Sequence, residues 1–318
     1  MLEIYNWIYA FRLKTLPLSL SGIILSSFIS FSEKGIFNIN ILIWSSITSI
    51  LLQILSNLAN DYGDGIKNID NINSIGPKRT IQSCMISKNQ MIIALIIFSI
   101  LSFISHMILL YYSFKDHMIL LYYSFKDHMI LYSFFKDKMI MIVIFIIGIF
   151  ICIFSAIKYT IGNNPYGYIG LGDLSVLIFF GLISLEGNYY LYNHIFNYKL
   201  LLLCFSLGFL TVSVLNINNM RDIENDKKYG KYTIPVIIGL KNAKIYHTLL
   251  MIVPFILSII YVFITYKSIY QYIFILLIIP TIMHLKNIYH NHDFNHELNI
   301  AIYINILYTL LMGIGFIL

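Results

Sequence analysis

The chain has 318 residues, of which 58% are hydrophobic and only 11% are charged, whereas roughly a quarter of the residues in a soluble domain are charged. So few charges do not cover a water-soluble globule of this size, which argues against a soluble enzyme, a disordered chain and a nucleic-acid-binding domain. The net charge of +6 is instead typical of the basic cytoplasmic loops of a polytopic membrane protein.

Nine apolar stretches follow one another along the chain, each near the roughly 20 residues that a membrane-spanning helix needs. None alternates between apolar and polar residues as barrel strands do, so we expect an all-α membrane helix bundle. The whole chain, 1–318, is predicted to be a single transmembrane domain, and residues 1–14 an interfacial helix and not a cleavable signal. The expected spans are 16–32, 41–58, 91–114, 139–157, 174–191, 200–217, 246–266, 270–285 and 298–318.

The distribution of Lys and Arg predicts the orientation of these helices. With the N-terminus in the cytoplasm, 14 of the 21 basic residues fall on the cytoplasmic side, and the other 7 fall outside. Since basic residues are enriched in cytoplasmic loops, we expect the N-terminus inside, the C-terminus outside, and a bacterial cytoplasmic (inner) membrane as the location.

A tandem repeat interrupts the pattern after the third expected helix. The eleven residues His106–Asp116 read HMILLYYSFKD, His117–Asp127 repeat them identically, and His128–Asp137 repeat them with one residue missing. Each copy is too short to span a bilayer. We interpret 106–137 as a triplicated outer-loop insertion, which a surface loop tolerates. Copies with a period of 11 either extend a helix or lie at the interface.

Six of the 15 acidic residues lie in two short segments on the predicted cytoplasmic side. The first follows the second helix and reads Asn57-Leu-Ala-Asn60-Asp61-Tyr-Gly-Asp64, with Asp70 shortly after it. The second follows the sixth helix and runs from Asn216 to Asp226. Asp70 is equally compatible with being a third metal ligand and with being a solvated loop charge.

The spacing of these acids predicts a metal site. Asp61 and Asp64 are three residues apart, and Asp222 and Asp226 are four apart, so each pair shares one face if the segment is helical. Clustered carboxylates repel one another unless a cation compensates them. Hard oxygen ligands suit Mg²⁺, which binds through one or two carboxylates together with substrate phosphates. We therefore expect magnesium ions and a diphosphate between the two segments, although solvated loop charges are the simpler alternative for either segment alone.

Basic residues near the acids are candidates for binding a diphosphate. Arg79 follows a Gly-Pro turn in the same loop as the first segment, Lys158 ends the fourth helix, and Lys231 closes the loop after the second segment. Each of these positions also suits a cationic anchor at a cytoplasmic helix end, and the residues alone leave both interpretations open.

At these residues the chain resembles the UbiA superfamily of intramembrane prenyltransferases. The family pattern is N-x-x-x-D-x-x-D at one cytoplasmic helix end and D-x-x-x-D at another, which Asn57, Asp61 and Asp64, and then Asp222 and Asp226, match. Further blocks resemble the branch of the family that serves menaquinone biosynthesis, and together they cover nearly the whole chain outside the repeat. These blocks are Arg12–Pro17, Gln53–Asp64, Ile75–Arg79, Tyr159–Gly181, Val214–Gly239 and Asn242–His247.

The resemblance implies nine helices around a central cavity and a Mg²⁺-dependent transfer of a polyprenyl group. The donor would be polyprenyl diphosphate and the acceptor 1,4-dihydroxy-2-naphthoate, which would lose CO₂ and give demethylmenaquinone. Asp61, Asp64, Asp222 and Asp226 would hold the metal, supported by Asn57, Asn60 and Asn219. Asp173 would orient the aromatic acceptor or a basic group, and an N-terminal helix cap is an equal alternative for it.

Two other functions remain to be tested. Another UbiA-type enzyme would use a different aromatic acceptor with the same metal motifs. A cation-coupled transporter would also carry two polar clusters half a chain apart, but transporter sites usually lie at the middle of the membrane, whereas these acids are expected at one face.

Overall fold

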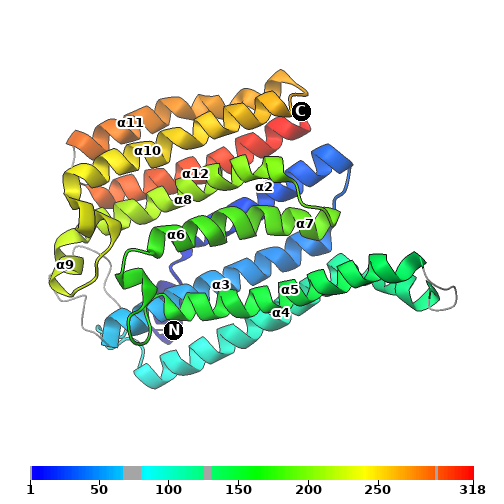
Figure 1. The fold of residues 1–318 in the computed structure, drawn as a ribbon. Coiled ribbons are helices and arrows are strands. Elements are labelled where there is room, and N and C mark those ends of the chain that lie inside the picture. The colour runs from blue at the N-terminus through cyan, green and yellow to red at the C-terminus, as the bar shows by residue number, and fades with distance from the viewer. Residues whose placement is uncertain (1, 67–79, 125–129, 291–292) are drawn as a thin grey trace.

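A computed structural model of the chain describes residues 2–66, 80–124, 130–290 and 293–318 (Figure 1). Over these residues nine helical segments are long and apolar enough to cross a membrane, which confirms the predicted number. The helical elements are α1 (Leu2–Phe11), η1 (Leu13–Thr15), α2 (Leu16–Lys34), α3 (Ile39–Ile66), α4 (Lys88–Ser124), α5 (Ile130–Lys158), η2 (Tyr166–Tyr168), α6 (Gly172–Val176), η3 (Leu177–Gly187), α7 (Asn188–Asn193), η4 (Tyr198–Leu200), α8 (Leu201–Arg221), α9 (Ile223–Lys228), α10 (Ile234–Ile264), η5 (Ile269–Leu277), α11 (Ile278–His290) and α12 (Phe294–Ile317).

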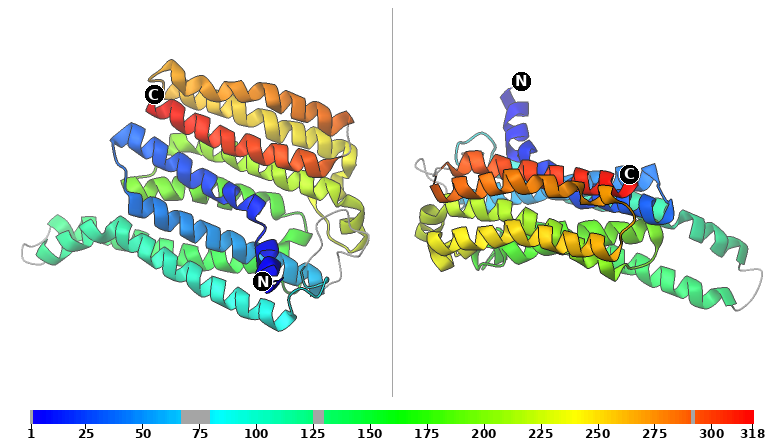
Figure 2. Two further views of the ribbon diagram at one scale, coloured as in Figure 1. Left: turned by 180° about the vertical axis from the view of Figure 1, so that it is seen from behind. Right: turned by 90° about the horizontal axis from the view of Figure 1, so that it is seen from above.

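The long helices lie roughly side by side and form one bundle, with α8 among the most enclosed of them (Figures 1 and 2). Bulky apolar side chains cover the outside; on α5, Ile147, Phe150 and Phe154 are each more than half exposed. Such a surface is unsuited to water and suited to lipid, and a helix satisfies its backbone hydrogen bonds within itself. The protein is therefore an integral membrane protein.

Helix α1 is separate from the first span, as the mixture of aromatic and basic residues predicts. The chain turns at Arg12, whose φ of 52° lies in the left-handed region, before α2 begins with Pro17 in its first turn. Seen from above, α1 stands out from the bundle at a steep angle (Figure 2). The turn brings the Arg12 side chain back toward the end of α3.

Several helices are longer than expected, and one is of an unusual kind. The repeat residues 106–124 and 130–137 lie in α4 and α5, whose ends extend past the other helices (Figure 1). Helix α10 (Ile234–Ile264) starts twelve residues before the expected span with Pro235 in its first turn, but its backbone breaks at Gly239 (φ 79°, ψ 157°), so a short first segment precedes the long helix. The fifth span contains a π-helix, η3, over eleven residues; π-helical turns are rare and often occur at functional sites.

The π-helix packs closely on α8 at a pair of glycines. A Cβ atom on Gly181 would lie 2.5 Å from the carbonyl oxygen of Cys204 and 3.1 Å from the Cα atom of Gly208. Only glycine permits this approach, which fixes the position of η3 against the most enclosed helix. The side chains that η3 presents to the bundle interior are therefore held in place.

We expect Gly181→Ala to lower the thermal unfolding midpoint of the purified protein, because its methyl group would force η3 away from α8 at a cost of about 1–3 kcal/mol. Gly148→Ala is the matched control, since nothing lies within 4 Å of a Cβ atom at that helical position. Thermal unfolding in detergent measures both variants. Equal midpoints for the two variants would contradict this account of the packing.

Candidate active site

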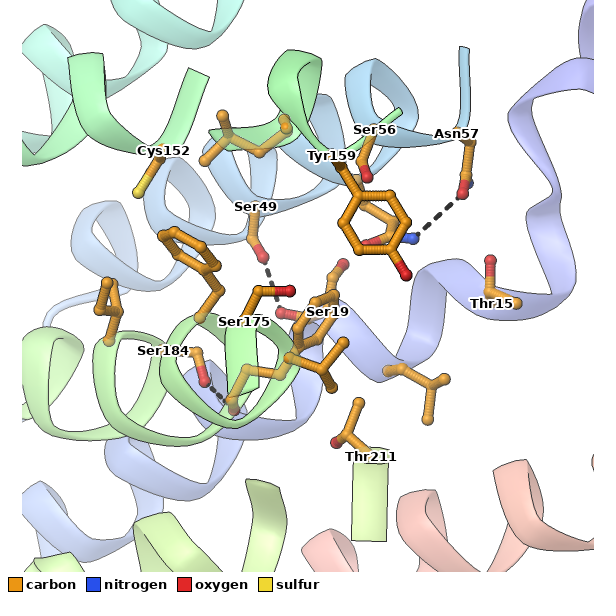
Figure 3. Close-up of a pocket in the computed structure, with 18 of the residues that line it drawn as sticks. Thr15, Ser19, Ser49, Ser56, Asn57, Cys152, Tyr159, Ser175, Ser184 and Thr211 are labelled. Atoms are coloured by element: carbon orange, nitrogen blue, oxygen red, sulfur yellow. Dashed lines mark hydrogen bonds between the residues drawn. The ribbon is translucent and has the colours of Figure 1, made fainter. Parts of the chain in front are cut away.

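A cavity of about 1230 Å³ lies inside the bundle. Its lining on α3 runs from Ser45 to Asp64, and the nineteen helical steps between these residues, at 1.5 Å each, give a length of about 28 Å. This is close to the roughly 30 Å thickness of a bilayer's hydrocarbon core. Serine, tyrosine and apolar side chains from α2, α3, α5, η3 and α8 face the same space (Figure 3). We call the end that carries Asp61 and Asp64 the motif end, and the opposite one the far end.

Asp61 and Asp64 are both buried at the motif end, with 2% and 1% of their surface exposed. The Oδ1 atom of Asp61 accepts a hydrogen bond from Arg12 Nη2 at 2.7 Å, and its Oδ2 atom accepts one from Thr80 Oγ1 at 2.9 Å. Tyr168 donates its hydroxyl to Asp64 Oδ1 at 2.5 Å. Buried carboxylates need such donors, so the first motif is already bound to three other segments of the chain.

Asp226 brings the second motif to the same place. Its carboxylate is 2% exposed, and its Oδ1 atom lies 3.4 Å from Lys231 Nζ. Burial raises the pKa of Asp226 to about 6; Lys231 opposes this rise, while the charges of Asp222 and Asp64 add to it. Asp64 and Asp226 are 162 residues apart in sequence, yet they are close enough in space to affect one another's charge. Lys231 lies between the two motifs, since its amine is 3.4 Å from Asp226 and 5.7 Å from the ring centre of Tyr168, which binds Asp64.

Asp222 lies at the junction of two helices. The sequence predicted one shared face for Asp222 and Asp226 if the segment is helical; α8 ends at Arg221, and Asp222, with φ −96° and ψ 9°, leads into α9. The carboxylate of Asp222 accepts two hydrogen bonds from Arg221, 2.8 Å from Nε and 2.7 Å from Nη2. The backbone N–H of Asp226 still donates to the carbonyl of Asp222, so the two acids remain one turn apart.

The predicted asparagines have different environments. Asn57 donates its amide to the carbonyl of Phe11 at 2.9 Å and so ties the end of α1 to α3. Asn219 is buried and lines the cavity. Asn60 also lines the cavity, and its buried Oδ1 atom has no hydrogen-bond partner among the described residues. Asn57 therefore supports the fold around the site, whereas Asn60 and Asn219 offer oxygen atoms to it.

The oxygen atoms available at the motif end are ligands that suit a magnesium ion. Two buried oxygen atoms, Asn60 Oδ1 and Asp226 Oδ2, have no partner in the described part of the chain, and both are hard ligands. Within that part, no three His, Cys, Asp or Glu side chains are close enough to hold one ion together. A metal here would thus be bound by one or two carboxylates with amide, water or phosphate oxygens, which is the usual coordination of Mg²⁺.

Lys158 and Asp173 are not at the cavity wall, and neither Asp222 nor Asp226 is part of its lining. Lys158 donates its amine to the carbonyl of Asn163 at 3.0 Å and is absent from the lining. Asp173 accepts a hydrogen bond from the Tyr246 hydroxyl at 2.9 Å; it lies in the first turn of α6, whose N-cap residue is Leu171. Arg79 and Asp70 lie outside the described residues. Lys231, in contrast, does line the cavity.

The motif end contains three residues that motif spacing did not identify: Arg12, Tyr159 and Tyr168. The Tyr159 hydroxyl points into the cavity (Figure 3), and burial raises the pKa of this group, so it stays protonated at neutral pH. The amine of Lys231 lies 5.7 Å from the centre of the Tyr168 ring. All three fall in the sequence blocks quoted above, but nothing in those blocks separates them from the other aromatic and basic residues.

The fold and the site define a class of protein: a membrane helix bundle with a long apolar cavity that ends in buried carboxylates. Residues 130–307 match the model of the UbiA prenyltransferase family. The chain is 40% identical to 1,4-dihydroxy-2-naphthoate octaprenyltransferase of Escherichia coli strain K12 over 77% of this chain and 72% of the relative. It is 37% identical to the protein of the same name from Haemophilus influenzae, over 85% and 81% respectively. The chain belongs to the UbiA prenyltransferase family.

Solved structures share the fold. A UbiA homolog from Aeropyrum pernix K1, in its apo form, superposes with a TM-score of 0.62 at 14% identity, covering 97% of this chain and 96% of that one. A UbiA homolog from Archaeoglobus fulgidus, described as bound to GPP and Mg²⁺, has a TM-score of 0.59 at 15% identity, with 96% and 99% covered. At these identities the likeness establishes the arrangement of the helices.

The raised pKa of Asp226 predicts that its buried carboxylate destabilises the metal-free protein at neutral pH. A carboxyl whose pKa rises from 3.8 to about 6 on folding favours the fold at low pH, and this contribution is lost as the pH rises through 6. Asp226→Asn should therefore stabilise the metal-free protein at pH 7.5 by on the order of 1–3 kcal/mol and change little at pH 4. Thermal unfolding in chelator at both pH values is the measurement. A destabilised variant at pH 7.5 would contradict the buried-charge account.

Proposed function

We propose that this protein transfers a polyprenyl group from polyprenyl diphosphate to 1,4-dihydroxy-2-naphthoate, with loss of CO₂ and diphosphate. The product is demethylmenaquinone, an intermediate of menaquinone biosynthesis. The observation that carries the proposal is the link between the two motifs at one end of the cavity, where Asp64 is bound by Tyr168, Lys231 lies over the Tyr168 ring, and the same Lys231 lies 3.4 Å from Asp226. The names of the relatives from Escherichia coli and Haemophilus influenzae, and the GPP and Mg²⁺ of the Archaeoglobus fulgidus structure, support it.

The diphosphate would bind at the motif end. Asp61, Asp64, Asp222 and Asp226 are proposed to hold magnesium, directly or through water, with the amide oxygens of Asn60 and Asn219 beside them. Bound Mg²⁺ would neutralise the diphosphate and help it leave. Arg12 and Lys231 both line the cavity there, and each already lies on one of the acids, so either cation is placed to turn toward a phosphate oxygen. Arg79 remains a prediction for the same role.

The reaction needs a dry, electron-rich wall beside this end. The C–O bond of the donor breaks, the diphosphate takes the electron pair, and the allylic carbon becomes cationic. A ring carbon of the naphthoate then forms the new C–C bond, and the carboxylate leaves as CO₂, whose bonding electron pair returns to the ring. The net exchange of CO₂ for the prenyl group gives the quinol, which a two-electron oxidant converts to demethylmenaquinone. Tyr159 and the rings of Phe179 and Phe180 line the cavity, where each aromatic face stabilises a nearby cation by roughly 0.5–2 kcal/mol. Exclusion of water protects the cation from hydrolysis.

Membrane topology follows from the same site. We place the motif end at the cytoplasmic face of a bacterial inner membrane, with the N-terminus inside, because most Lys and Arg residues fall on that side. Soluble naphthoate and Mg²⁺ would then reach the site from the cytoplasm, while the polyprenyl tail stays in hydrocarbon. The position of the acids at one end, away from the middle of the bundle, disfavours a cation-coupled transporter.

The first test is an assay of membranes that contain the protein, supplied with 1,4-dihydroxy-2-naphthoate and octaprenyl diphosphate. We expect prenylated naphthoquinone and released CO₂ with Mg²⁺, and neither with chelator. Product from 4-hydroxybenzoate but not from the naphthoate would keep the family activity and overturn the acceptor. Absence of product from every aromatic acceptor, with correctly inserted protein, would overturn the proposed reaction.

The second test concerns the metal ligands. Asp61→Asn and Asp222→Asn should each lower the turnover rate on the order of 100-fold, as loss of one preorganised electrostatic group does. Glu224→Gln is the matched control, because Glu224 is an acid of the same segment that is exposed and has no proposed role. Near-normal rates in properly inserted Asp variants, measured with saturating Mg²⁺, would refute the ligand assignment.

A further inference from the structure

One corner of the motif end has no part in the mechanism above. It lies where η1 and the start of α2 meet the end of α8 and the start of α12. Leu18 of α2 and Leu298 of α12 pack in one apolar cluster with residues from the last turns of α8, so the three helices are in contact there. We call this part of the cavity, lined by Lys14, Leu18, Leu215, Leu298 and Asn299, the α12 corner.

Helices α2 and α12 lie side by side and parallel, and two hydrogen bonds fix their register (Figure 2). Ser21 Oγ donates to Asn305 Oδ1 at 2.9 Å. Toward the far end, Ser32 Oγ donates to the backbone carbonyl of Phe316 at 2.6 Å. Both pairs are 284 residues apart in sequence, so the two helices keep the same register over this length.

The cation of the α12 corner is Lys14. Two turns from Ser21 toward the motif end, the register of 284 residues brings Lys14 level with Leu298 and next to Asn299. The Lys14 side chain is exposed, lines the cavity and forms no hydrogen bond or ion pair with the described residues. Arg12, two residues before it, is bound to Asp61. Lys14 therefore presents an uncompensated positive charge to the cavity.

The carboxylates around this corner are bound to other groups. Asp61 and Asp222 each accept hydrogen bonds from an arginine. On α12, Glu297 pairs with a histidine of α11, and Asp293 accepts the backbone N–H of a residue in the first turn. Neither of these two α12 acids lines the cavity. An anion that enters the corner thus meets a cation that no carboxylate of the described residues neutralises.

The walls around Lys14 suit a flat ring with polar substituents. Leu18, Leu215 and Leu298 offer apolar surface to the faces of a ring. The side-chain amide of Asn299 has no hydrogen-bond partner among the described residues, so it has a donor and an acceptor to offer. An ammonium group binds a carboxylate through charge-assisted hydrogen bonds. Together these features fit an aromatic carboxylate that also carries hydroxyl groups.

We propose that Lys14 binds the carboxylate of the aromatic acceptor, whose ring lies in the α12 corner until the carboxylate leaves as CO₂. Lys14 is thus a binding and specificity residue, which selects aromatic carboxylates over neutral aromatic alcohols and keeps its own proton throughout. Two residues span at most about 7 Å, so the turn that carries Lys14 lies beside the site where Arg12 meets Asp61. This inference rests on the proposed prenyl transfer, because it assumes an aromatic second substrate.

The first test measures KM for both substrates. In Lys14→Gln the KM for 1,4-dihydroxy-2-naphthoate should rise on the order of 10-fold, because one charge-assisted hydrogen bond is lost. The KM for octaprenyl diphosphate should stay the same. Lys14→Arg keeps the charge and should retain the wild-type values. Lys241→Gln is the matched control, since Lys241 is an exposed lysine of α10 that does not line the cavity.

The second test compares two competitive inhibitors that differ only in the carboxylate, 1-hydroxy-2-naphthoate and 1-naphthol. Lys14→Gln should weaken inhibition by the carboxylate on the order of 10-fold and leave inhibition by 1-naphthol unchanged, which also reports that the corner is intact. Asn299→Asp adds a negative charge to the same corner. This variant should therefore weaken inhibition by 1-hydroxy-2-naphthoate more than inhibition by 1-naphthol.

Each alternative gives a different result. A raised KM for octaprenyl diphosphate with unchanged acceptor constants would overturn the inference and assign Lys14 to the diphosphate. Unchanged constants for both substrates in active Lys14→Gln would also overturn it and leave Lys14 a cationic anchor. An equal loss of inhibition by 1-naphthol would overturn it as well, because the substitution would then have disturbed the whole corner. These three results leave the proposed function intact, whereas no product from any acceptor in the wild type would remove that function itself.

Discussion

The structure depends on the burial of like charges at the end of an apolar bundle. Asp61, Asp64 and Asp226 are each almost fully enclosed, and Asp64 and Asp226 act on one another electrostatically. A low-dielectric environment makes both their repulsion and their attraction to cations strong. The surrounding chain compensates with Arg12, Lys231 and the Tyr168 hydroxyl. The same charges that destabilise the bundle give it an affinity for a divalent cation.

The position of these charges also decides what the rest of the cavity does. A cation and a diphosphate are stable only where the acids and water meet, whereas the tail is stable only in hydrocarbon. Both environments lie in one continuous cavity of about bilayer length. Polar residues of α3 line the cavity toward Asp64, and aromatic residues of η3 line it opposite α3. Binding of the head and of the tail is thereby separated along a single axis.

Much of the fold was predictable because it follows from local chemistry. Apolar runs of bilayer length predict spanning helices whatever surrounds them, and the nine expected spans agree with the structure apart from their ends. The ends were less predictable, since α10 begins at Ile234 and the repeat residues that are described lie within helices. The distortion at Asp222 between α8 and α9 was not predictable either, although the bond from Asp226 N–H to the Asp222 carbonyl keeps the two acids one turn apart.

The sequence by itself determined the class of the chain, the number of its spans and the two acidic motifs, since composition, hydropathy and spacing are properties of short segments. Only the tertiary structure decided which charges meet. It brought Arg12 and Tyr168 onto the acids, kept Lys158 and Asp173 off the cavity wall, and placed Lys14 on that wall together with Asn299. Pairing between segments more than a hundred residues apart depends on how the helices pack, and close contacts such as that of Gly181 with Cys204 set the packing.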